Sequence, residues 1–343
     1  MKKSFLWGLV FSVAGCESGD PSLPNVPLRP PSAEPPADEP VQTDAGPPKA
    51  APFTCAPGKP GAVGDRELAI ETGEGKERTV LLHVPTTYDP TKGLPLIVGF
   101  HGYGGNAEQM REQTGLDAEA DKRGFVVAYV LGTGVASKGF NAGDCCGAPA
   151  WASDTDDLGL AREIVKTLSA QYCVDPKRVY SAGFSNGGFM SYRMVCEAAD
   201  VFAAVASVAG VLGVPPETCK PARPVPLIHI HGTNDRTVPY EGGGAAGGLG
   251  TLAGIKFRSV ADSVGTLRKA WTCGETSKEV AKTTDTRCEE WTGCAAEAKV
   301  ELCTVDGGGH QWPGGKGTPV GGKTSEFAAT KNILDFFEAH PMR

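Results

Sequence analysis

The sequence lacks three features that would have assigned it to other classes of protein. The apolar run from Ser4 to Gly15 is too short to span a bilayer, which takes about 20 apolar residues. There is no Cys-x-x-Cys pair, and the late cysteines have no nearby histidines at zinc-ligand spacing. There is also no basic stripe or aromatic-plus-arginine cluster of the kind that binds nucleic acid. We therefore expect neither a structural metal nor a nucleic-acid partner.

The N-terminus has the layout of a signal peptide, because Lys2 and Lys3 precede the apolar run. The run ends in Val13-Ala14-Gly15-Cys16, which resembles the lipobox of bacterial lipoproteins. In that class the cysteine is acylated and becomes the mature N-terminus. We expect residues 1–16 to be such a signal, with Cys16 anchoring an exported protein to a membrane through lipid. The alternative is an ordinary secretory signal with a chance cysteine.

A proline-rich stretch separates this signal from the rest of the chain. From Glu17 to Pro52, 11 of 36 residues are proline, and another 11 are Ala, Asp or Glu. Such a segment buries too little apolar surface to offset the entropy lost on ordering. Residues 17–52 are therefore predicted to be a disordered linker. Residues 53–343 are long enough for one large domain with its own core.

The cysteine count predicts disulfides. Of the 11 cysteines, Cys16 is set aside for lipid, and the even remainder in an exported chain indicates up to five bridges. Cys145-Cys146 fits either a vicinal bridge or two separate bonds. The residues alone do not assign partners to Cys145, Cys146, Cys173, Cys273, Cys288, Cys294 and Cys303.

Short apolar strands alternate with amphipathic helices along residues 79–339. The expected strands are 79–84, 94–100, 125–130, 178–184, 203–209, 225–231 and 299–305, and the expected helices are 106–123, 156–171, 186–199, 256–272 and 325–339. This alternation predicts an α/β fold with a mostly parallel sheet covered by helices on both faces. In such sheets ligands bind at the carboxyl ends of the strands.

Ser185 lies in Gly183-Phe184-Ser185-Asn186-Gly187, which fits the pattern G-x-S-x-G. In a nucleophile elbow the chain turns at once from strand to helix, and side chains larger than glycine would clash beside the serine. A tight turn without chemistry is the alternative reading of so short a motif. The predicted strand before it and helix after it favour Ser185 as a nucleophile.

A second loop, His101-Gly-Tyr-Gly-Gly, follows the expected strand 94–100. In α/β-hydrolases this turn supplies one half of the oxyanion hole, and the residue after the nucleophile supplies the other. The backbone N–H groups of Tyr103 and Asn186 are therefore the expected donors. His101 itself is expected to brace the loop.

Two further loops offer an acid and a base. Asp235 comes just after the strand 225–231, where it can accept the Nδ1 proton of a histidine, and His310 lies in a glycine-rich loop after the strand 299–305. The competing carboxylates Asp156 and Asp157 begin a helix and are expected to cap it. The chain order Ser185, Asp235, His310 matches the order of hydrolase triads.

Several longer motifs, AGFSNGGFMSYRMVCE, RPVPLIHIHGTNDRTVPYEGG and GGGHQWPGG, resemble one bacterial esterase family. It contains polyhydroxybutyrate depolymerase-like enzymes and feruloyl and acetylxylan esterases, and the similarity runs through most of residues 60–340. The resemblance implies an α/β-hydrolase fold, secretion, and hydrolysis of carboxylic esters without a cofactor by a triad of Ser185, Asp235 and His310. It also implies a Cys196–Cys219 disulfide. Extra cysteines and the glycine-rich stretch 242–250 depart from the family pattern.

The choice of ester depends on fewer residues. Trp312, two residues after His310, and Trp151, in a loop after an expected strand, could form an aromatic wall for a hydroxycinnamoyl group or a sugar, or could lie in the core. Depolymerases of this family often carry a separate surface-binding domain, for which residues 53–343 leave no room. We therefore favour a feruloyl or acetylxylan esterase acting on plant polysaccharide over a polyhydroxybutyrate depolymerase. A noncatalytic, carbohydrate-binding surface lipoprotein is disfavoured because all three triad residues are present.

Overall fold

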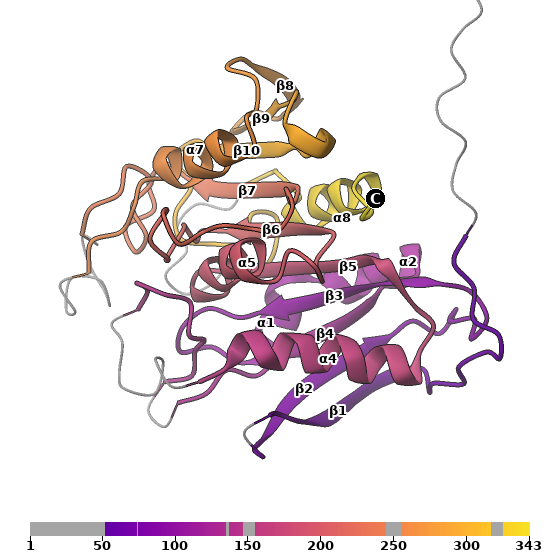
Figure 1. The fold of residues 1–343 in the computed structure, drawn as a ribbon. Coiled ribbons are helices and arrows are strands. Elements are labelled where there is room, and N and C mark those ends of the chain that lie inside the picture. Colours follow the sequence, from indigo (N-terminus) through magenta and orange to yellow (C-terminus); the bar gives the residue numbers. More distant parts are fainter. Residues whose placement is uncertain (1–51, 74, 135–136, 147–154, 245–254, 317–324) are drawn as a thin grey trace, which may run out of the picture. The chain divides into compact units, whose positions relative to one another are not determined.

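Figure 1 shows the chain in a computed structural model, which describes residues 52–73, 75–134, 137–146, 155–244, 255–316 and 325–343. Within these residues, ten strands form one sheet in the order β1-β2-β4-β3-β5-β6-β7-β10-β9-β8. The strands are β1 (Gly64–Glu71), β2 (Glu77–Val84), β3 (Leu94–Phe100), β4 (Val126–Val130), β5 (Val174–Phe184), β6 (Ala204–Val208), β7 (Leu227–Gly232), β8 (Ser277–Lys282), β9 (Thr286–Trp291) and β10 (Val300–Val305). The helices are α1 (Ala107–Thr114), α2 (Leu116–Arg123), α4 (Asp157–Gln171), α5 (Asn186–Glu197), α7 (Val260–Ala270) and α8 (Ala329–Ala339), with a short 3-10 turn at Ala295–Glu297.

The centre of the sheet is parallel and its flanks are antiparallel. The pairs β4–β3, β3–β5, β5–β6, β6–β7 and β7–β10 are parallel, whereas β1 and β2 on one side and β9 and β8 on the other pair antiparallel. Every residue of β3, β4, β6 and β7 is buried, because helices cover both faces of a parallel sheet. The predicted mostly parallel α/β sheet is confirmed.

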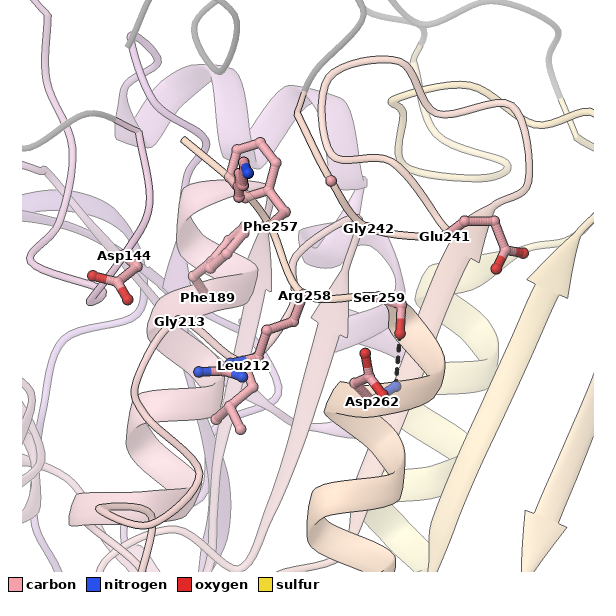
Figure 2. Close-up of a pocket in the computed structure, with 12 residues that line it drawn as sticks. Asp144, Phe189, Leu212, Gly213, Glu241, Gly242, Phe257, Arg258, Ser259 and Asp262 are labelled. Atoms are coloured by element: carbon pink, nitrogen blue, oxygen red, sulfur yellow. Dashed lines mark hydrogen bonds between the residues drawn. The ribbon is translucent and has the colours of Figure 1, made fainter. Parts of the chain in front are cut away.

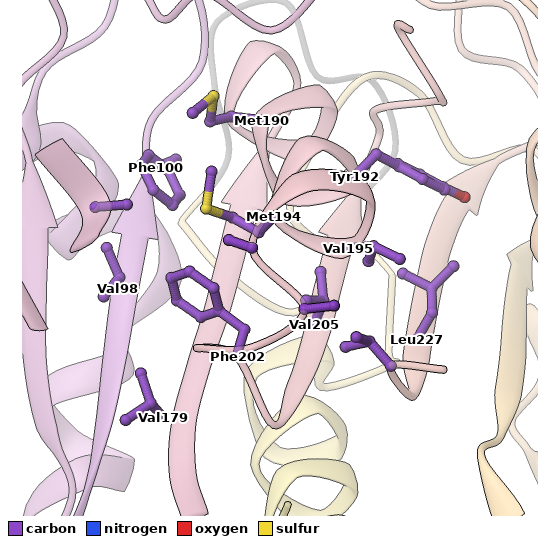
Figure 3. Close-up of a cluster of buried hydrophobic side chains, with 14 of the residues drawn as sticks. Val98, Phe100, Val179, Met190, Tyr192, Met194, Val195, Phe202, Val205 and Leu227 are labelled. Atoms are coloured by element: carbon purple, nitrogen blue, oxygen red, sulfur yellow. The ribbon is translucent and has the colours of Figure 1, made fainter. Parts of the chain in front are cut away.

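Each face of the sheet carries its own helices and its own apolar cluster. One cluster takes side chains from α4, α5 and α7, and the other from α1, α2 and α8. Figure 3 shows part of the first cluster, where Met194 and Val195 of α5 lie over Val98 and Val205 of the strands. Each fully buried side chain of this size contributes about 1.5–3 kcal/mol of hydrophobic stabilisation. This packing fixes α5, and with it the turn at its N-terminus.

The structure departs from the expected elements in two ways. The single helix expected over 106–123 is two helices, because Gly115 adopts a left-handed conformation with φ of 60° and its N–H closes α1 on Arg111. The strands β1, β8 and β9 were not expected from the sequence. Most residues of β1 alternate between partly buried and exposed, β8 is mostly exposed, and β9 has charged residues between its buried ones, so no continuous apolar run marks these strands.

Five disulfides join the ten cysteines among the described residues: Cys55–Cys173, Cys145–Cys146, Cys196–Cys219, Cys273–Cys294 and Cys288–Cys303. The Cys196–Cys219 pair implied by the family resemblance is confirmed. Of the two readings for residues 145 and 146, the vicinal bridge is the one that the structure shows. Cys288–Cys303 joins two residues that lie directly opposite each other on β9 and β10.

The predictions for the N-terminal segment are not tested by the structure. Cys16 and all but the last residue of the predicted linker 17–52 lie outside the described residues. Among the residues that are described, no helix has the length and apolar character needed to cross a membrane.

Candidate active site

Ser185 occupies the turn between β5 and α5 in a backbone conformation that few side chains adopt. Its φ is 53° and its ψ is −119°, outside the regions that are favourable for residues other than glycine. A Cβ atom on Gly183 would lie 1.9 Å from the carbonyl oxygen of Gly187, and one on Gly187 would lie 1.9 Å from that of Phe100. The glycines of the motif are therefore sterically required, as expected of a nucleophile elbow.

The structure brings Ser185, His310 and Asp235 together in one hydrogen-bonded series. His310 Nε2 lies 2.9 Å from Ser185 Oγ, and His310 Nδ1 lies 2.7 Å from Asp235 Oδ2. Because an ionised carboxylate only accepts, Nδ1 carries the proton that donates to Asp235, which leaves Nε2 of the neutral ring to accept from the serine hydroxyl. This arrangement can remove a proton from Ser185 and hold it on His310.

The loops that carry the acid and the base leave the sheet side by side. β7 and β10 pair in parallel, so both chains exit at the same edge. Backbone bonds then join the two loops: Thr233 N–H donates to Val305 O and Asn234 N–H donates to Gly308 O, both at 2.9 Å. The positions of Asp235 and His310 are thus coupled through the backbone.

Asp235 is buried and fully supplied with donors. Its side chain has 0% exposure, and Oδ1 accepts from the N–H groups of Thr237 and Val238, each at 2.8 Å. Burial by itself would raise the pKa of Asp235, but hydrogen bonds from His231 and His310 outweigh it and hold the pKa below its ordinary value. The carboxylate is therefore ionised at neutral pH, as the partner of a histidine base must be.

The glycine turn after β3 packs against the nucleophile. A Cβ on Gly102 would lie 3.3 Å from Ser185 Cβ, which places Tyr103 of the same turn close to the serine. His101 braces this turn, as expected: its Nδ1–H donates to Gly102 O at 2.7 Å, and Gly132 N–H donates to its Nε2 at 2.9 Å. Burial lowers the pKa of His101 to about 4, so the ring is neutral and available for both bonds.

The side chain of Asn186 has a second role that sequence reasoning missed. Asn186 begins α5, where the first N–H groups of a helix have no intrahelical partner. Its side-chain amide accepts from Phe140 N–H at 2.7 Å and donates to Phe140 O at 3.2 Å. It also lies 3.5 Å from Cys145 Sγ. Asn186 thereby ties the loop with the vicinal disulfide to the nucleophile turn, a long-range contact with no local sequence signal.

Comparison with known proteins shows which family the chain belongs to. Residues 72–238 match a family model described as "Putative esterase". Over 96% of its length the chain is 31% identical to "Putative esterase NocK" of Nocardia uniformis subsp. tsuyamanensis, and it covers 95% of that protein. The chain belongs to this esterase family. It is accordingly a carboxylic ester hydrolase, as predicted.

Two further proteins are similar to this esterase, one in sequence and one in fold. It is 35% identical to feruloyl esterase B of Piromyces equi over 70% of its own length, but it spans only 44% of that protein. Its structure is similar to an acetyl xylan esterase from Aspergillus awamori with a TM-score of 0.55 and 13% identity, covering 80% of the esterase and 99% of that chain. At this identity the likeness concerns the fold, and it agrees with the predicted α/β-hydrolase fold.

Of the two roles left open for Trp312, aromatic wall for substrate or core residue, the structure shows the core. Its side chain is 2% exposed, and its indole N–H donates to Thr330 Oγ1 at 2.9 Å. Trp312 belongs to the apolar cluster under α8, where it cannot serve as a wall for substrate. The other predicted wall residue, Trp151, lies outside the described residues.

The two acidic residues at the start of α4 divide their roles. Asp156 caps the helix, accepting from Gly159 N–H at 2.7 Å, as expected. Asp157 instead turns inward: it pairs with Arg78 at 2.9 Å and accepts from Asn141 N–H at 2.7 Å, with 0% of its side chain exposed. It is a buried structural carboxylate rather than a cap, and neither residue competes with Asp235 for His310.

Among the described residues, two groups of side chains have the composition of metal ligands. Cys288 and Cys303 lie with Glu301, but the sulfurs are joined to each other and have no thiolate to offer. Asp65, His83 and Asp117 also lie together. There Arg111 pairs with both carboxylates and His83 bonds to Asp65, so these acids already have cationic partners.

Figure 2 shows a pocket of about 400 Å³ whose lining includes Phe189 of α5, Leu212 and Phe257. Phe189, one turn along α5 from Ser185, donates its N–H to Ser185 O at 3.0 Å. Gly210, two residues before Leu212, packs against the same carbonyl. The aromatic rings of Phe189 and Phe257 lie 5.7 Å apart. Charged residues of both signs complete the lining: Asp144, Glu241, Lys256, Arg258 and Asp262.

Proposed function

We propose that this esterase is a serine enzyme in which Ser185 is the nucleophile, His310 the base and Asp235 the acid. The observation that supports it most is the unbroken series Ser185 Oγ to His310 Nε2, 2.9 Å, and His310 Nδ1 to Asp235 Oδ2, 2.7 Å. Adjacent distances within hydrogen-bond reach are what nucleophile, base and orienting acid require. The strained backbone of Ser185 adds a second, independent reason.

The proposed reaction has two acyl-transfer steps. His310 Nε2 takes the proton of Ser185 while Oγ attacks the ester carbonyl, and the N–H groups of Tyr103 and Asn186 hold the developing oxyanion. His310 then gives its proton to the leaving alcohol, which leaves an acyl group on Ser185. Water repeats the sequence: His310 takes its proton, the hydroxide attacks the acyl-enzyme, and the acid and free Ser185 are released. Asp235 stays ionised and stabilises the imidazolium in both steps.

We propose esters of plant polysaccharides, feruloyl or acetyl, as the substrates. The similarity to feruloyl esterase B of Piromyces equi supports this choice. The pocket lined by Phe189 and Phe257 supports it too, because aromatic rings with hydrogen-bonding charges of both signs suit a neutral, hydroxyl-rich sugar. We assign this pocket to the polysaccharide part of the ester.

We also propose that the protein is exported and held at a membrane through Cys16. Five disulfides are typical of proteins that fold in an oxidising compartment. Replacing Cys16 by Ser should move the protein from the membrane fraction to the soluble fraction. Unchanged membrane association of that variant would contradict the anchor.

The catalytic proposal is tested with p-nitrophenyl acetate and a fluorophosphonate probe. The wild type should hydrolyse the ester and be labelled on Ser185 by mass mapping, and Ser185→Ala should lose both. Equal rates for the two proteins, or no turnover by either, would contradict an enzyme and favour a noncatalytic binding protein on this fold. Labelling of another residue would show that the nucleophile is that residue and not Ser185.

The substrate proposal is tested by product analysis with methyl ferulate, acetylated xylan and short-chain polyhydroxybutyrate in parallel. Release of ferulate or of acetate from xylan is the expected result. Release of 3-hydroxybutyrate alone would instead make the protein a polyester depolymerase.

A further inference from the structure

Behind Asp235, three buried polar side chains form a hydrogen-bonded chain that the proposed reaction does not use. Tyr192 OH lies 2.8 Å from His229 Nδ1, and His229 Nε2 lies 3.1 Å from His231 Nδ1. His231 Nε2 then lies 2.9 Å from Val238 O and 3.4 Å from Asp235 Oδ2. His229 and His231 stand two residues apart on β7, so both face α5 and stack with ring centroids 5.3 Å apart.

When the His231 ring is neutral, the last acceptor of this chain fixes every proton in it. A backbone carbonyl only accepts, so His231 Nε2 must carry a proton. In the neutral ring Nδ1 is then an acceptor, which requires His229 to donate from Nε2 and to accept at Nδ1. Tyr192 OH must therefore donate to His229. Burial, aided by the neighbouring His231, lowers the pKa of His229 well below its ordinary value, so that ring is neutral as this order requires.

The far end of the chain, His231, lies beside the proposed triad acid. His231 Nε2 donates to Val238 O and lies 3.4 Å from Asp235 Oδ2, which is also the oxygen that accepts from His310. Asp235 Oδ1 is held separately by two backbone N–H groups. His231 Nε2 is thus the second ring nitrogen within ion-pair distance of the oxygen that His310 uses.

This chain lies where apolar residues would normally be. β7 is a fully buried central strand between β6 and β10, and such strands are typically continuous apolar runs. Figure 3 shows Tyr192 turned away from Met190 and Met194 of the apolar cluster, with its hydroxyl directed to the side. Buried polar groups are costly unless every member is paired, and the bonds above pair each of them.

We propose that His231 is a positioning residue of the triad: held in one tautomer by His229 and Tyr192, it keeps Asp235 Oδ2 turned toward His310. This inference rests on the proposed function, because it assigns a role to groups behind the proposed acid. His231 touches neither substrate nor the reacting atoms and acts through Asp235. The titratable groups around its ring are Asp235, His229 and Tyr240, with His310 beyond Asp235.

The test compares two substitutions of the same residue. His231→Met removes the donor while keeping side-chain volume, and His231→Gln keeps an amide N–H that can reach Asp235. With p-nitrophenyl acetate, His231→Met should lower kcat about 10- to 100-fold, as misplacing a catalytic group does, with KM nearly unchanged. The acid limb of its kcat/KM profile should move to lower pH, because an Asp235 carboxylate that no longer faces His310 stabilises the imidazolium less. His231→Gln should restore both quantities to within a few-fold of wild type.

A matched pair of tyrosine variants tests the rest of the chain. Tyr192→Phe leaves His229 Nδ1 without its donor and should lower kcat several-fold. Tyr180→Phe is the control, because Tyr180 OH is also buried but has no hydrogen-bond partner in the structure, and its kcat should equal that of wild type. Equal kcat for the two variants would contradict a role for Tyr192.

A merely structural role for His231 would give a different pattern. In that case His231→Met and His231→Gln would lose kcat equally, in proportion to their loss of Tm, and the acid limb would stay in place. That result, or a His231→Met variant with kcat within twofold of wild type, overturns the inference. If His231→Met does not fold, His231→Gln and Tyr192→Phe carry the comparison.

The inference and the proposed function fail in distinguishable ways. Wild type that neither hydrolyses ester nor labels at Ser185 contradicts the function. The inference can still be tested without turnover: NMR titration of the His310 Cε1–H resonance should show a lower pH midpoint in His231→Met than in wild type. An unchanged midpoint overturns the inference whether or not the wild type is active.

Discussion

The side-chain amide of Asn186 pairs with both backbone polar groups of Phe140, which lies 46 residues earlier in the chain. The amide oxygen accepts from Phe140 N–H and the amide nitrogen donates to Phe140 O. The side chain of Asn186 thus satisfies both backbone polar groups of Phe140. Asn186 follows the proposed nucleophile directly. The loop around Phe140 is therefore fastened to the most constrained point of the site.

Replacing Asn186 by Ala should destabilise the protein and slow the reaction. Two buried backbone groups of Phe140 would lose their partners, which costs about 1–3 kcal/mol for each group left unsatisfied. Urea unfolding measures the loss. Asn332→Ala on α8 is the matched control, because that amide donates only to Ala328 O at an exposed position, and a change within about 0.5 kcal/mol is expected there. Equal effects of the two substitutions would contradict the bracing role.

Replacing Arg78 by Met should leave the buried Asp157 without its cation. Removing one partner of a buried ion pair costs about 3–5 kcal/mol, and urea unfolding at neutral pH should show it. Burial already raises the pKa of Asp157, with Arg78 opposing, so protonation at low pH should reduce the cost.

Two comparisons sharpen this prediction. Asp157→Asn in the Arg78→Met background should recover part of the lost stability. Arg162→Met breaks a pair with Asp200 in which the two side chains are 37% and 61% exposed, and it should cost less than about 1 kcal/mol. An Arg78 variant as stable as the Arg162 variant would show that the buried pair contributes little.

Glu301 should make the protein less stable as pH rises. It lies opposite Glu290 on β9, and burial, then Glu290, raise its pKa to about 7 from 4.5, with Lys299 opposing. Between these values the folded protein holds a proton that the unfolded chain releases, so the free energy of unfolding falls with increasing pH. Glu301→Gln should therefore raise Tm at pH 8 and change it little at pH 4.

The control for Glu301 is Glu279→Gln, which removes the same charge from an exposed position of β8. Thermal melts of both variants and wild type at the two pH values provide the comparison. A Tm gain in Glu301→Gln that is equal at pH 4 and pH 8 would show that titration of Glu301 is not its cause.

Replacing Arg258 by Ala should weaken binding of polymer without affecting a small ester. A lost hydrogen bond to a charged group costs about 1.5–3 kcal/mol, so KM for feruloylated or acetylated xylan should rise about tenfold. KM for p-nitrophenyl acetate should stay within twofold, because the small alcohol does not reach the pocket. Arg287→Ala is the control, since that side chain is exposed on β9. Unchanged KM for polymer would exclude the pocket as the sugar site.

Local patterns in the sequence determined the central strands, most of the helices and the three triad residues. Each residue of the proposed triad lies in the loop or turn after a strand of the parallel part of the sheet, and parallel strands end at one edge of the sheet, so Ser185, Asp235 and His310 could be placed together without coordinates. The glycines around Ser185 could be recognised for the same reason, because the constraint on them is local.

Tertiary structure alone decided the features that depend on which distant segments meet. The edge strands β1 and β8 are marked by pairing rather than by apolar runs, and the burial of Trp312 depends on where α8 lies. Four of the five disulfide pairings could not be assigned from the sequence, because each cysteine had several possible partners. The bond from Asn186 to Phe140 and the chain from Tyr192 to His231 join residues that are remote in sequence. The physical reason is that a hydrogen bond or a buried contact needs two groups within a few ångströms, and only the folded chain sets those distances.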